Sequence, residues 1–307
     1  MPLAFLAVVL PALFWDRPPE TADTLRKAGI ERIAVPAGQE QAWRKLGFAA
    51  TAFDRARAVQ AVAPRVEYQM DVASATRVPW VDANGWRFER EPGRAFFYDV
   101  PAGSAALAAA EAFAYGAAAA IRAAPEDVAA FAGMLKFLRE IDQPRLPARA
   151  NIGVMDDGSG TMGEVLNLMA RHNLLFQAIK AGDDKYDLNI RKVPVGVNPY
   201  DFAMQVRRDL TDEKRLVRIF GSNVVLVRLT GEGSRARVHL LNYGRAPVKG
   251  LRVRVLGSYA QGKLAAFGLP GEALEDYTVQ DGATEFTIPE LGAYAVVDLV
   301  GQRHALP

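Results

Sequence analysis

The sequence predicts a multidomain protein in which α/β layers are followed by an all-β domain, and three observations lead to this prediction. Short apolar segments alternate with helical ones from residue 11 to about residue 150, which is typical of parallel βα units. A smaller alternation of the same kind covers residues 151–221. Over residues 222–307 the pattern changes to evenly spaced short strands, so we expect a C-terminal antiparallel β-sandwich there.

Residues 1–10 have two interpretations. Residues 3–14 form an apolar run of signal-peptide length, but no Lys or Arg precedes it. Alternatively, residues 12–15 are a buried first strand. A cleaved signal would make the protein periplasmic or secreted, and without one it would be cytoplasmic. The run is too short to cross a bilayer, and the sequence contains no other candidate for an integral membrane segment.

The first domain is predicted to be rich in short elements. We expect strands at residues 12–15, 30–36, 49–54, 65–71, 95–100 and 117–121. We expect helices at residues 20–29, 39–47, 104–115 and 125–141. Residues 72–95 interrupt this rhythm and are predicted to be a long connection with a turn at Asn84-Gly85. Pro144 and Pro147 mark a linker to the next domain.

The remaining domains are predicted to differ in kind. The middle one should hold strands at 151–156 and 174–179, a helix at 164–172, and helical turns between 201 and 220. The seven sandwich strands are expected at residues 224–229, 236–242, 251–256, 263–267, 275–279, 284–288 and 293–299. Polar and apolar residues alternate over residues 252–255, as in half-buried antiparallel strands.

The composition excludes several kinds of site. The chain has no cysteine, which excludes disulfides, thiolate catalysis and zinc–sulfur centres. Its three histidines, His172, His239 and His304, are far apart, so we expect neither a metal site nor a Ser–His–Asp triad, and no cofactor is implied.

The charge pattern argues against nucleic acid as a partner. The 37 basic residues nearly balance the 35 acidic ones, and no basic stripe is present. Arginines do alternate in two predicted strands of the sandwich, where we expect them to form a solvated sheet face. They are Arg235, Arg237, Arg252 and Arg254.

Several predicted strands of the first domain end in a carboxylate, which suggests acid–base chemistry. They are Asp16, Asp54, Asp71 and Asp99. Sites of α/β sheets and barrels gather at the carboxyl ends of parallel strands, and glycoside hydrolysis needs two carboxyl groups about 5 to 10 Å apart. We interpret Asp71 and Asp99 as the catalytic pair and Asp16 as a substrate-binding residue. The alternative is that each Asp is a turn former or helix cap.

A second candidate set lies in the predicted connection. Trp80, Asp82, Asn84 and Trp86 combine flat aromatic faces with amide and carboxylate groups, which suits a sugar ring. We therefore predict that they line a substrate groove. The alternative is a loop held in place by its two tryptophans.

Two further features receive structural interpretations. The loop at residues 155–161 lacks the glycine spacing and the lysine of a phosphate loop, so Ser159 or Thr161 is better read as a helix N-cap. A nucleotide or flavin site there remains a third alternative. Glu111, among alanines in a predicted helix, is expected to face solvent.

The order of the domains resembles that of beta-galactosidases with a trimerisation domain and of related glycoside hydrolases. The segment Arg237-Val-His-Leu-Leu-Asn-Tyr243 resembles a strand and turn of their sandwich. The resemblance implies a partial or truncated βα-barrel over residues 11–150, a small flavodoxin-like α/β layer over 151–221 and a β-sandwich over 222–307. A full barrel takes about 250 residues, and the acid–Asn or acid–Glu strand ends of these enzymes have no counterpart here.

These observations lead to two hypotheses for function. The first is a glycoside-hydrolase-like protein that acts on or binds a carbohydrate. The second is a non-catalytic carbohydrate-binding or assembly protein on a degenerate barrel, whose middle layer and sandwich would support a homo-oligomer.

Overall fold

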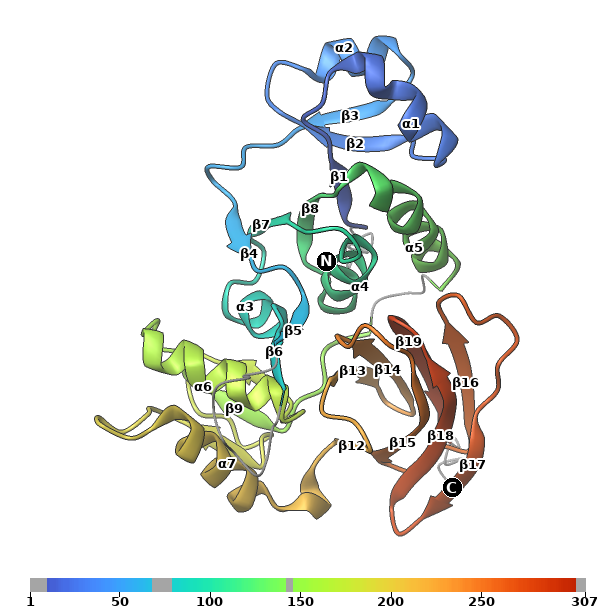
Figure 1. Cartoon of the computed structure of the whole chain (residues 1–307). Helices are drawn as coiled ribbons and strands as arrows, with labels where there is room; N and C mark the ends of the chain where they lie inside the picture. Colours follow the sequence, from blue (N-terminus) through green and yellow to red (C-terminus); the bar gives the residue numbers. More distant parts are fainter. Residues whose placement is uncertain (1–9, 68–78, 142–145, 302–307) are drawn as a thin grey trace, which may run out of the picture. The chain divides into compact units, whose positions relative to one another are not determined.

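The structure, a computed structural model, describes residues 10–67, 79–141 and 146–301 (Figure 1). The chain divides into two compact units. Of the described residues, unit 1 contains 10–65, 82–84 and 91–141, and unit 2 contains 66–67, 79–81, 85–90 and 146–301. None of the described helices is long and apolar enough to cross a membrane.

Unit 1 is built on a six-stranded sheet in the order β3-β2-β1-β8-β7-β4, in which all neighbouring strands are parallel. Its strands are β1 (Ala12–Phe14), β2 (Arg32–Val35), β3 (Ala49–Ala52), β4 (Val59–Ala61), β7 (Ala95–Asp99) and β8 (Ala118–Arg122). The first strand pairs with the last one, and the sheet is open between β3 and β4. The strands predicted at 12–15, 30–36, 49–54, 95–100 and 117–121 are found in this sheet, and β4 was not predicted. The described part of the strand predicted at 65–71 is β5 (Arg65–Glu67), which lies outside this sheet.

The helices of unit 1 follow the predicted ranges closely. They are α1 (Ala22–Lys27), α2 (Glu40–Lys45), α4 (Ala105–Tyr115) and α5 (Val128–Glu140), with 3₁₀ turns at Pro19–Thr21 and Pro125–Asp127. Gly116 ends α4 in the left-handed conformation with φ 64°, which glycine adopts without strain. The predicted apolar stripe of α5 is buried.

Unit 2 contains a small parallel layer with strand order β10-β9-β11. Its elements are β9 (Ile152–Val154), α6 (Gly160–Arg171), β10 (Phe176–Ala178), β11 (Leu188–Ile190) and α7 (Pro199–Lys214). Helices α6 and α7 share a buried core with the strands. Strand β11 was not predicted, because a three-residue strand carries almost no periodic signal.

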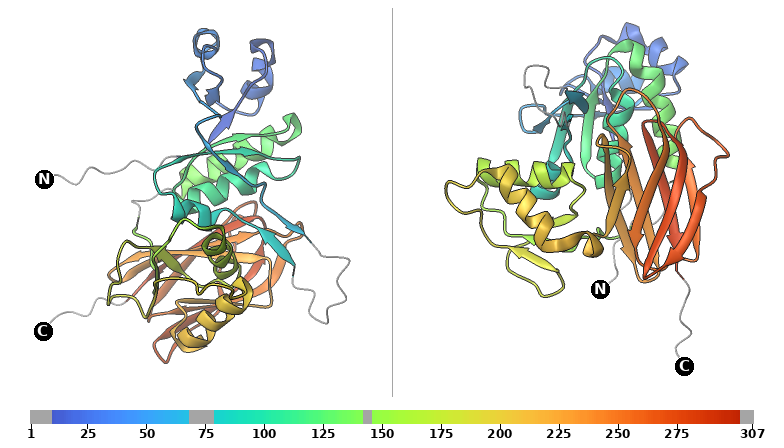
Figure 2. Two further views of the ribbon diagram at one scale, coloured as in Figure 1. Left: turned by 90° about the vertical axis from the view of Figure 1, so that its left-hand side faces the viewer. Right: turned by 60° about the horizontal axis from the view of Figure 1, so that its bottom comes forward.

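The rest of unit 2 is the predicted β-sandwich, made of two four-stranded antiparallel sheets in the orders β12-β15-β18-β17 and β13-β14-β19-β16. Its strands are β12 (Val217–Phe220), β13 (Val225–Glu232), β14 (Arg235–Asn242), β15 (Val248–Leu256), β16 (Gln261–Ala266), β17 (Glu275–Gln280), β18 (Ala283–Leu291) and β19 (Tyr294–Val300). All seven predicted strands are confirmed, and β12 adds an eighth. The strands lie side by side in the second view of Figure 2.

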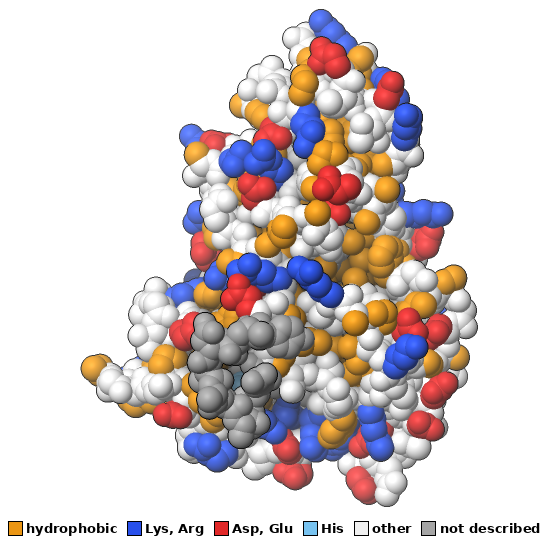
Figure 3. All heavy atoms as spheres, in the orientation of Figure 1, with side chains coloured by type: hydrophobic (Ala, Val, Ile, Leu, Met, Phe, Trp, Pro, Cys, Tyr) orange, Lys and Arg blue, Asp and Glu red, His pale blue; other side chains and the backbone are white. Residues whose placement is uncertain are grey.

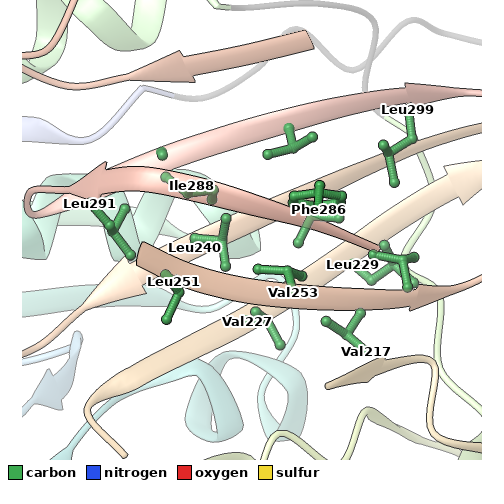
Figure 4. Packing of buried hydrophobic residues seen from close by; sticks show 14 of the residues in the cluster. Val217, Val227, Leu229, Leu240, Leu251, Val253, Phe286, Ile288, Leu291 and Leu299 are labelled. Atoms are coloured by element: carbon green, nitrogen blue, oxygen red, sulfur yellow. The ribbon is translucent and has the colours of Figure 1, made fainter. Parts of the chain in front are cut away.

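The sandwich core contains side chains from both sheets. Phe286 and Leu251 come from one sheet and Leu240 and Leu229 from the other, and all are almost completely buried (Figure 4). The alternation predicted over residues 252–255 is found in β15, where Val253 and Val255 are buried in this core.

The predicted solvated arginine face is wrong for Arg237, which is only 7% exposed. Its guanidinium binds the Asp298 carboxylate through two contacts of 2.6 and 2.9 Å. His239, on the same strand, is also buried, and its Nδ1 lies 2.7 Å from the Tyr294 hydroxyl. Paired charges can be buried, so alternation of residue type does not by itself place a side chain in solvent.

The predicted long connection over residues 72–95 is also wrong where the structure describes it. Strand β6 (Trp80–Asp82) pairs with β5 (Arg65–Glu67), and Gly85–Arg90 forms helix α3. Residues 68–78 lie outside the described residues. The Asn84-Gly85 pair predicts a turn, but Gly85 begins the six-residue helix α3. Asn and Gly occur both in turns and where helices begin, so the pair does not distinguish the two.

Candidate functional site

The carboxyl edge of the unit 1 sheet brings together Asp16 and Asp99, two of the residues predicted from sequence. Arg122, at the end of β8, lies between them: its Nε is 3.2 Å from Asp16 Oδ2 and its Nη1 is 3.1 Å from Asp99 Oδ2. Alternation along the strands places all three side chains on the face that carries Phe14 and Phe97. The sheet thus gathers charged groups at its carboxyl edge, as the pattern predicted.

An aromatic layer lies beneath these charges. The rings of Phe14 and Phe97 are 5.2 Å apart and almost completely buried. Phe53 packs against both rings, and the Arg55 guanidinium lies 4.6 Å above the Phe97 ring. The layer is therefore covered by side chains, and the surface beside it offers charged groups that already contact one another.

The residues predicted to form one groove lie in separate surroundings. Asp82 accepts a hydrogen bond from Arg65 Nε at 2.9 Å. Asn84 is buried in unit 1, and Trp86 lies in α3 of unit 2. Trp80 lines a cavity in unit 2. Asp71 lies outside the described residues, so its predicted catalytic role remains a prediction.

Asn84 belongs to a buried hydrogen-bond network centred on Glu111. The Glu111 carboxylate accepts bonds from the Asn84 backbone N–H at 2.6 Å, the Asn84 side-chain amide at 2.9 Å and the Tyr98 hydroxyl at 2.7 Å. The prediction that Glu111 faces solvent is therefore wrong, since the residue is completely buried. Asn84 also exchanges hydrogen bonds with the backbone of Val62. These contacts give both side chains a structural role.

Trp86 packs inside unit 2 against α6. A Cβ atom on Gly163 would lie 3.3 Å from the Trp86 ring and 2.5 Å from Arg90 Nη1, so a larger residue there would require the Arg90 side chain to shift. Arg90 is anchored in turn by bonds of 2.7 and 3.0 Å to the Asp156 carboxylate. Trp86 thus packs against the core of this layer from a helix, and not from the loop that the packing alternative assumed.

A cavity of 370 Å³ in unit 2, here called the Trp80 pocket, has the lining of a ligand site. It lies where β6, the end of α6 and the start of α7 meet. It is lined by Pro79, Trp80, Glu164, Leu168, Arg171, His172, Asn198, Pro199, Tyr200 and Asn223. Its volume falls in the range of about 300 to 1,000 Å³ that is usual for small-molecule sites.

The polar groups of the Trp80 pocket have defined orientations. The Arg171 guanidinium lies 3.8 Å from the Trp80 ring and donates to the Pro79 carbonyl at 3.2 Å. His172 lies edge-on to Tyr200, with ring centres 6.2 Å apart. Burial, with the charges of Arg171 and two other arginines, lowers the pKa of His172 to about 4, so the ring is neutral at pH 7.

In the loop before α6, carboxylates of the loop itself accept the backbone hydrogen bonds that a phosphate would need. Ser159 caps the helix, as predicted, by accepting from the Met162 N–H at 3.1 Å. The Gly158 and Ser159 N–H groups donate to Asp156 and Asp157 at 2.9 and 2.8 Å. Bonds from Ser159 lower the pKa of Asp157, which keeps the loop anionic. Within the described residues, no cluster of three or more acidic or histidine side chains could hold a metal ion.

Several residues of the carboxyl edge and of the Trp80 pocket were not predicted from the sequence. Arg122 and Arg55 in unit 1, and Arg171, His172 and Tyr200 in unit 2, were not singled out. Arg122 could have been found, because it ends a predicted strand as the aspartates do. The pocket residues come from three elements distant in sequence, so no local pattern connected them.

No protein-family model matches the sequence, and no curated protein sequence matches it. Solved structures similar to the chain are glycoside hydrolases, as the domain order predicted. An alpha-L-fucosidase isoenzyme 2 from Paenibacillus thiaminolyticus is 10% identical with a TM-score of 0.49 over 69% of this chain. A family-42 beta-galactosidase from G. stearothermophilus is 9% identical with a TM-score of 0.38 over 80%.

The chain spans 61% of the fucosidase and 53% of the beta-galactosidase. A rhamnosidase from Novosphingobium sp. PP1Y is 13% identical with a TM-score of 0.27, over 69% of this chain and 17% of the enzyme. Similarity at this level does not carry the substrate of any of these enzymes over to this chain.

Proposed function

We propose that the chain is a glycoside-hydrolase-like protein that binds a carbohydrate in the Trp80 pocket. The observation that carries this proposal is the lining of the pocket, in which Trp80 and Tyr200 supply aromatic surface beside the polar groups of Glu164, Asn198 and Asn223. Apolar contact with a few directed hydrogen bonds is the combination that a sugar ring requires. Asp82, Asn84 and Trp86 would support the surrounding fold instead of touching the sugar.

The charge pattern favours a small ligand over nucleic acid. On the face seen in Figure 3, Lys and Arg side chains lie beside Asp and Glu side chains. Such a surface lacks the continuous basic track that a phosphate backbone needs.

The test is a thermal-shift screen of the purified chain against mono- and oligosaccharides. Binding to the native state raises the melting temperature, and Trp80→Ala should abolish the shift. Phe220→Ala is the matched control, because Arg218 lies over the Phe220 ring at 4.9 Å but neither residue lines the pocket. Asn223→Ala, at an exposed pocket position, serves if Trp80→Ala does not fold. A flat response across the panel would reject the proposal.

Hydrolysis at the carboxyl edge of unit 1 is the second candidate, favoured by the placement of Asp16 and Asp99 on one face of parallel strands. The strand order β3-β2-β1-β8-β7-β4 fits a partial βα-barrel that is open between β3 and β4. Residues 11–150 would then be the barrel part, followed by a flavodoxin-like layer and the sandwich. In this scheme Asp99 and Asp71 form the acid–base pair.

The arrangement of Arg122 weighs against this second candidate. Its guanidinium contacts the carboxylates of Asp16 and Asp99, so Asp99 already has an ion-pair partner that a substrate would have to displace. Asp71→Asn and Asp99→Asn decide the matter for any saccharide that the chain hydrolyses: both variants should lose turnover, and unchanged rates would eliminate the pair as catalysts.

A further inference from the structure

One face of α6 supplies charges of both signs to the Trp80 pocket. Glu164, Leu168 and Arg171 are spaced i, i+4 and i+7, so they lie in a row along the helix. At 1.5 Å per residue the two charged positions are about 10 Å apart. The pocket therefore has an acidic end and a basic end, separated by the apolar side chain of Leu168.

The basic end is held in place by its neighbours. Contact with the Trp80 ring and a hydrogen bond to the Pro79 carbonyl orient the Arg171 guanidinium. The planar fork of an arginine matches the two oxygens of a carboxylate. Arg171, Arg207 and Arg215 all act on His172, so the surroundings of this end are positive, and Asp212 binds Arg207 and Arg215.

We propose that the saccharide of the Trp80 pocket is acidic, with its carboxylate at Arg171 and its hydroxyl groups directed towards Glu164, Asn198 and Asn223. This inference rests on the proposed function and names its substrate class, the uronic-acid sugars. A carboxylate is preferred to a phosphate because Glu164 shares the cavity and would repel a dianion more strongly than a monoanion.

The test compares each acid with its own uncharged form. Isothermal titration calorimetry is carried out on the full chain with uronic-acid disaccharides of gluco and galacto configuration and with their methyl esters. The acid should bind at least about tenfold more tightly than the ester, the scale of one charge-assisted hydrogen bond. This comparison needs no variant, so it holds whether or not any substitution disturbs folding.

Variants then locate the charge that is responsible. In Arg171→Gln the acid and the ester should bind within about twofold of each other. Arg208→Gln is the matched control, because Arg208 is exposed on α7, donates to Gln205 at 2.7 Å and lies outside the pocket. It should keep the full preference for the acid.

The outcomes separate this inference from the proposed function. Equal binding of acid and ester by the unaltered chain would overturn the acidic ligand and leave carbohydrate binding standing. A preference that survives Arg171→Gln, or tighter binding of a sugar phosphate, would also overturn it. Absence of binding by acids, esters and neutral sugars alike would overturn both.

Discussion

The carboxyl edge of unit 1 and the Trp80 pocket of unit 2 contain the same kinds of charged side chain in different arrangements. At the edge, Arg122 lies within 3.2 Å of Asp16 and 3.1 Å of Asp99. In the pocket, Glu164 and Arg171 are two helical turns apart, about 10 Å along the axis. Opposite charges in contact neutralise each other at the edge, whereas the helical spacing keeps Glu164 and Arg171 apart in the pocket.

The largest effect should come from an acid of unit 1 that serves only the fold. Glu111→Ala leaves the Asn84 N–H, the Asn84 amide and the Tyr98 hydroxyl without their acceptor. At about 1 to 3 kcal/mol for each buried polar group left unpaired, the free energy of unfolding should fall by about 3 kcal/mol or more. Urea denaturation measures it.

The control for this prediction is Glu31→Ala, an exposed acid of the same unit, which should change stability by less than about 0.5 kcal/mol. Equal losses in the two variants would contradict the structural role of Glu111.

The second-largest effect is the pH dependence of the free energy of unfolding that His172, in the pocket wall, causes. The pKa of His172 is lowered to about 4 in the folded protein, so between pH 6.5 and 4 the unfolded chain binds the extra proton. The free energy of unfolding should therefore decrease as the pH falls through this window. The loss attributable to His172 should reach about 2 kcal/mol, less than the full shift implies because the ring is part-exposed.

His172→Gln removes this contribution. Unfolding curves of the variant and the unaltered chain, recorded from pH 7 to pH 4, should diverge towards the acidic side. Parallel profiles would show that the histidine is not desolvated as the structure indicates.

A smaller effect is expected at the rim of the pocket. Tyr200 is 51% exposed, so Tyr200→Ala should leave the melting temperature nearly unchanged. Loss of its ring should weaken saccharide binding about fivefold to tenfold, the scale of an aromatic contact. Val195→Ala, on a fully exposed residue outside the pocket, should bind as the unaltered chain does. Equal affinities in both variants would remove Tyr200 from the site.

The smallest change in stability should come from substitutions at the carboxyl edge of unit 1. The side chains of Arg122 and Asp99 are 42% and 56% exposed, so their ion pair should contribute less than about 1 kcal/mol to stability. A double-mutant cycle with Arg122→Gln and Asp99→Asn measures the coupling, and saccharide binding by the pocket should be unchanged. A coupling free energy well above about 1 kcal/mol would contradict the interpretation of this pair as an exposed, weakly coupled one.

The sandwich was predictable strand by strand, because short apolar or alternating segments are separated at even spacing by turn residues. The parallel strands of unit 1 were predictable for a related reason, since they read as short apolar runs. Four short strands, β4, β6, β11 and β12, were not predicted because three or four residues hold too little periodicity.

The candidate site was only partly predictable. Asp16 and Asp99 both contact Arg122 at one edge, because strand ends of a parallel sheet share an edge. Glu111 and Arg237 were misplaced, because burial of a charge depends on partners that come from other elements. Trp80 lines the pocket, but Arg171 and Tyr200, which line it too, lie far along the chain.

The most direct test of the account is a crystal structure of the chain soaked with a saccharide that raises its melting temperature. The account predicts density for the sugar in the Trp80 pocket, against Trp80 and Tyr200, with an acidic group at Arg171. Density at the carboxyl edge, over Arg122 and Asp99, with the pocket empty, would contradict it.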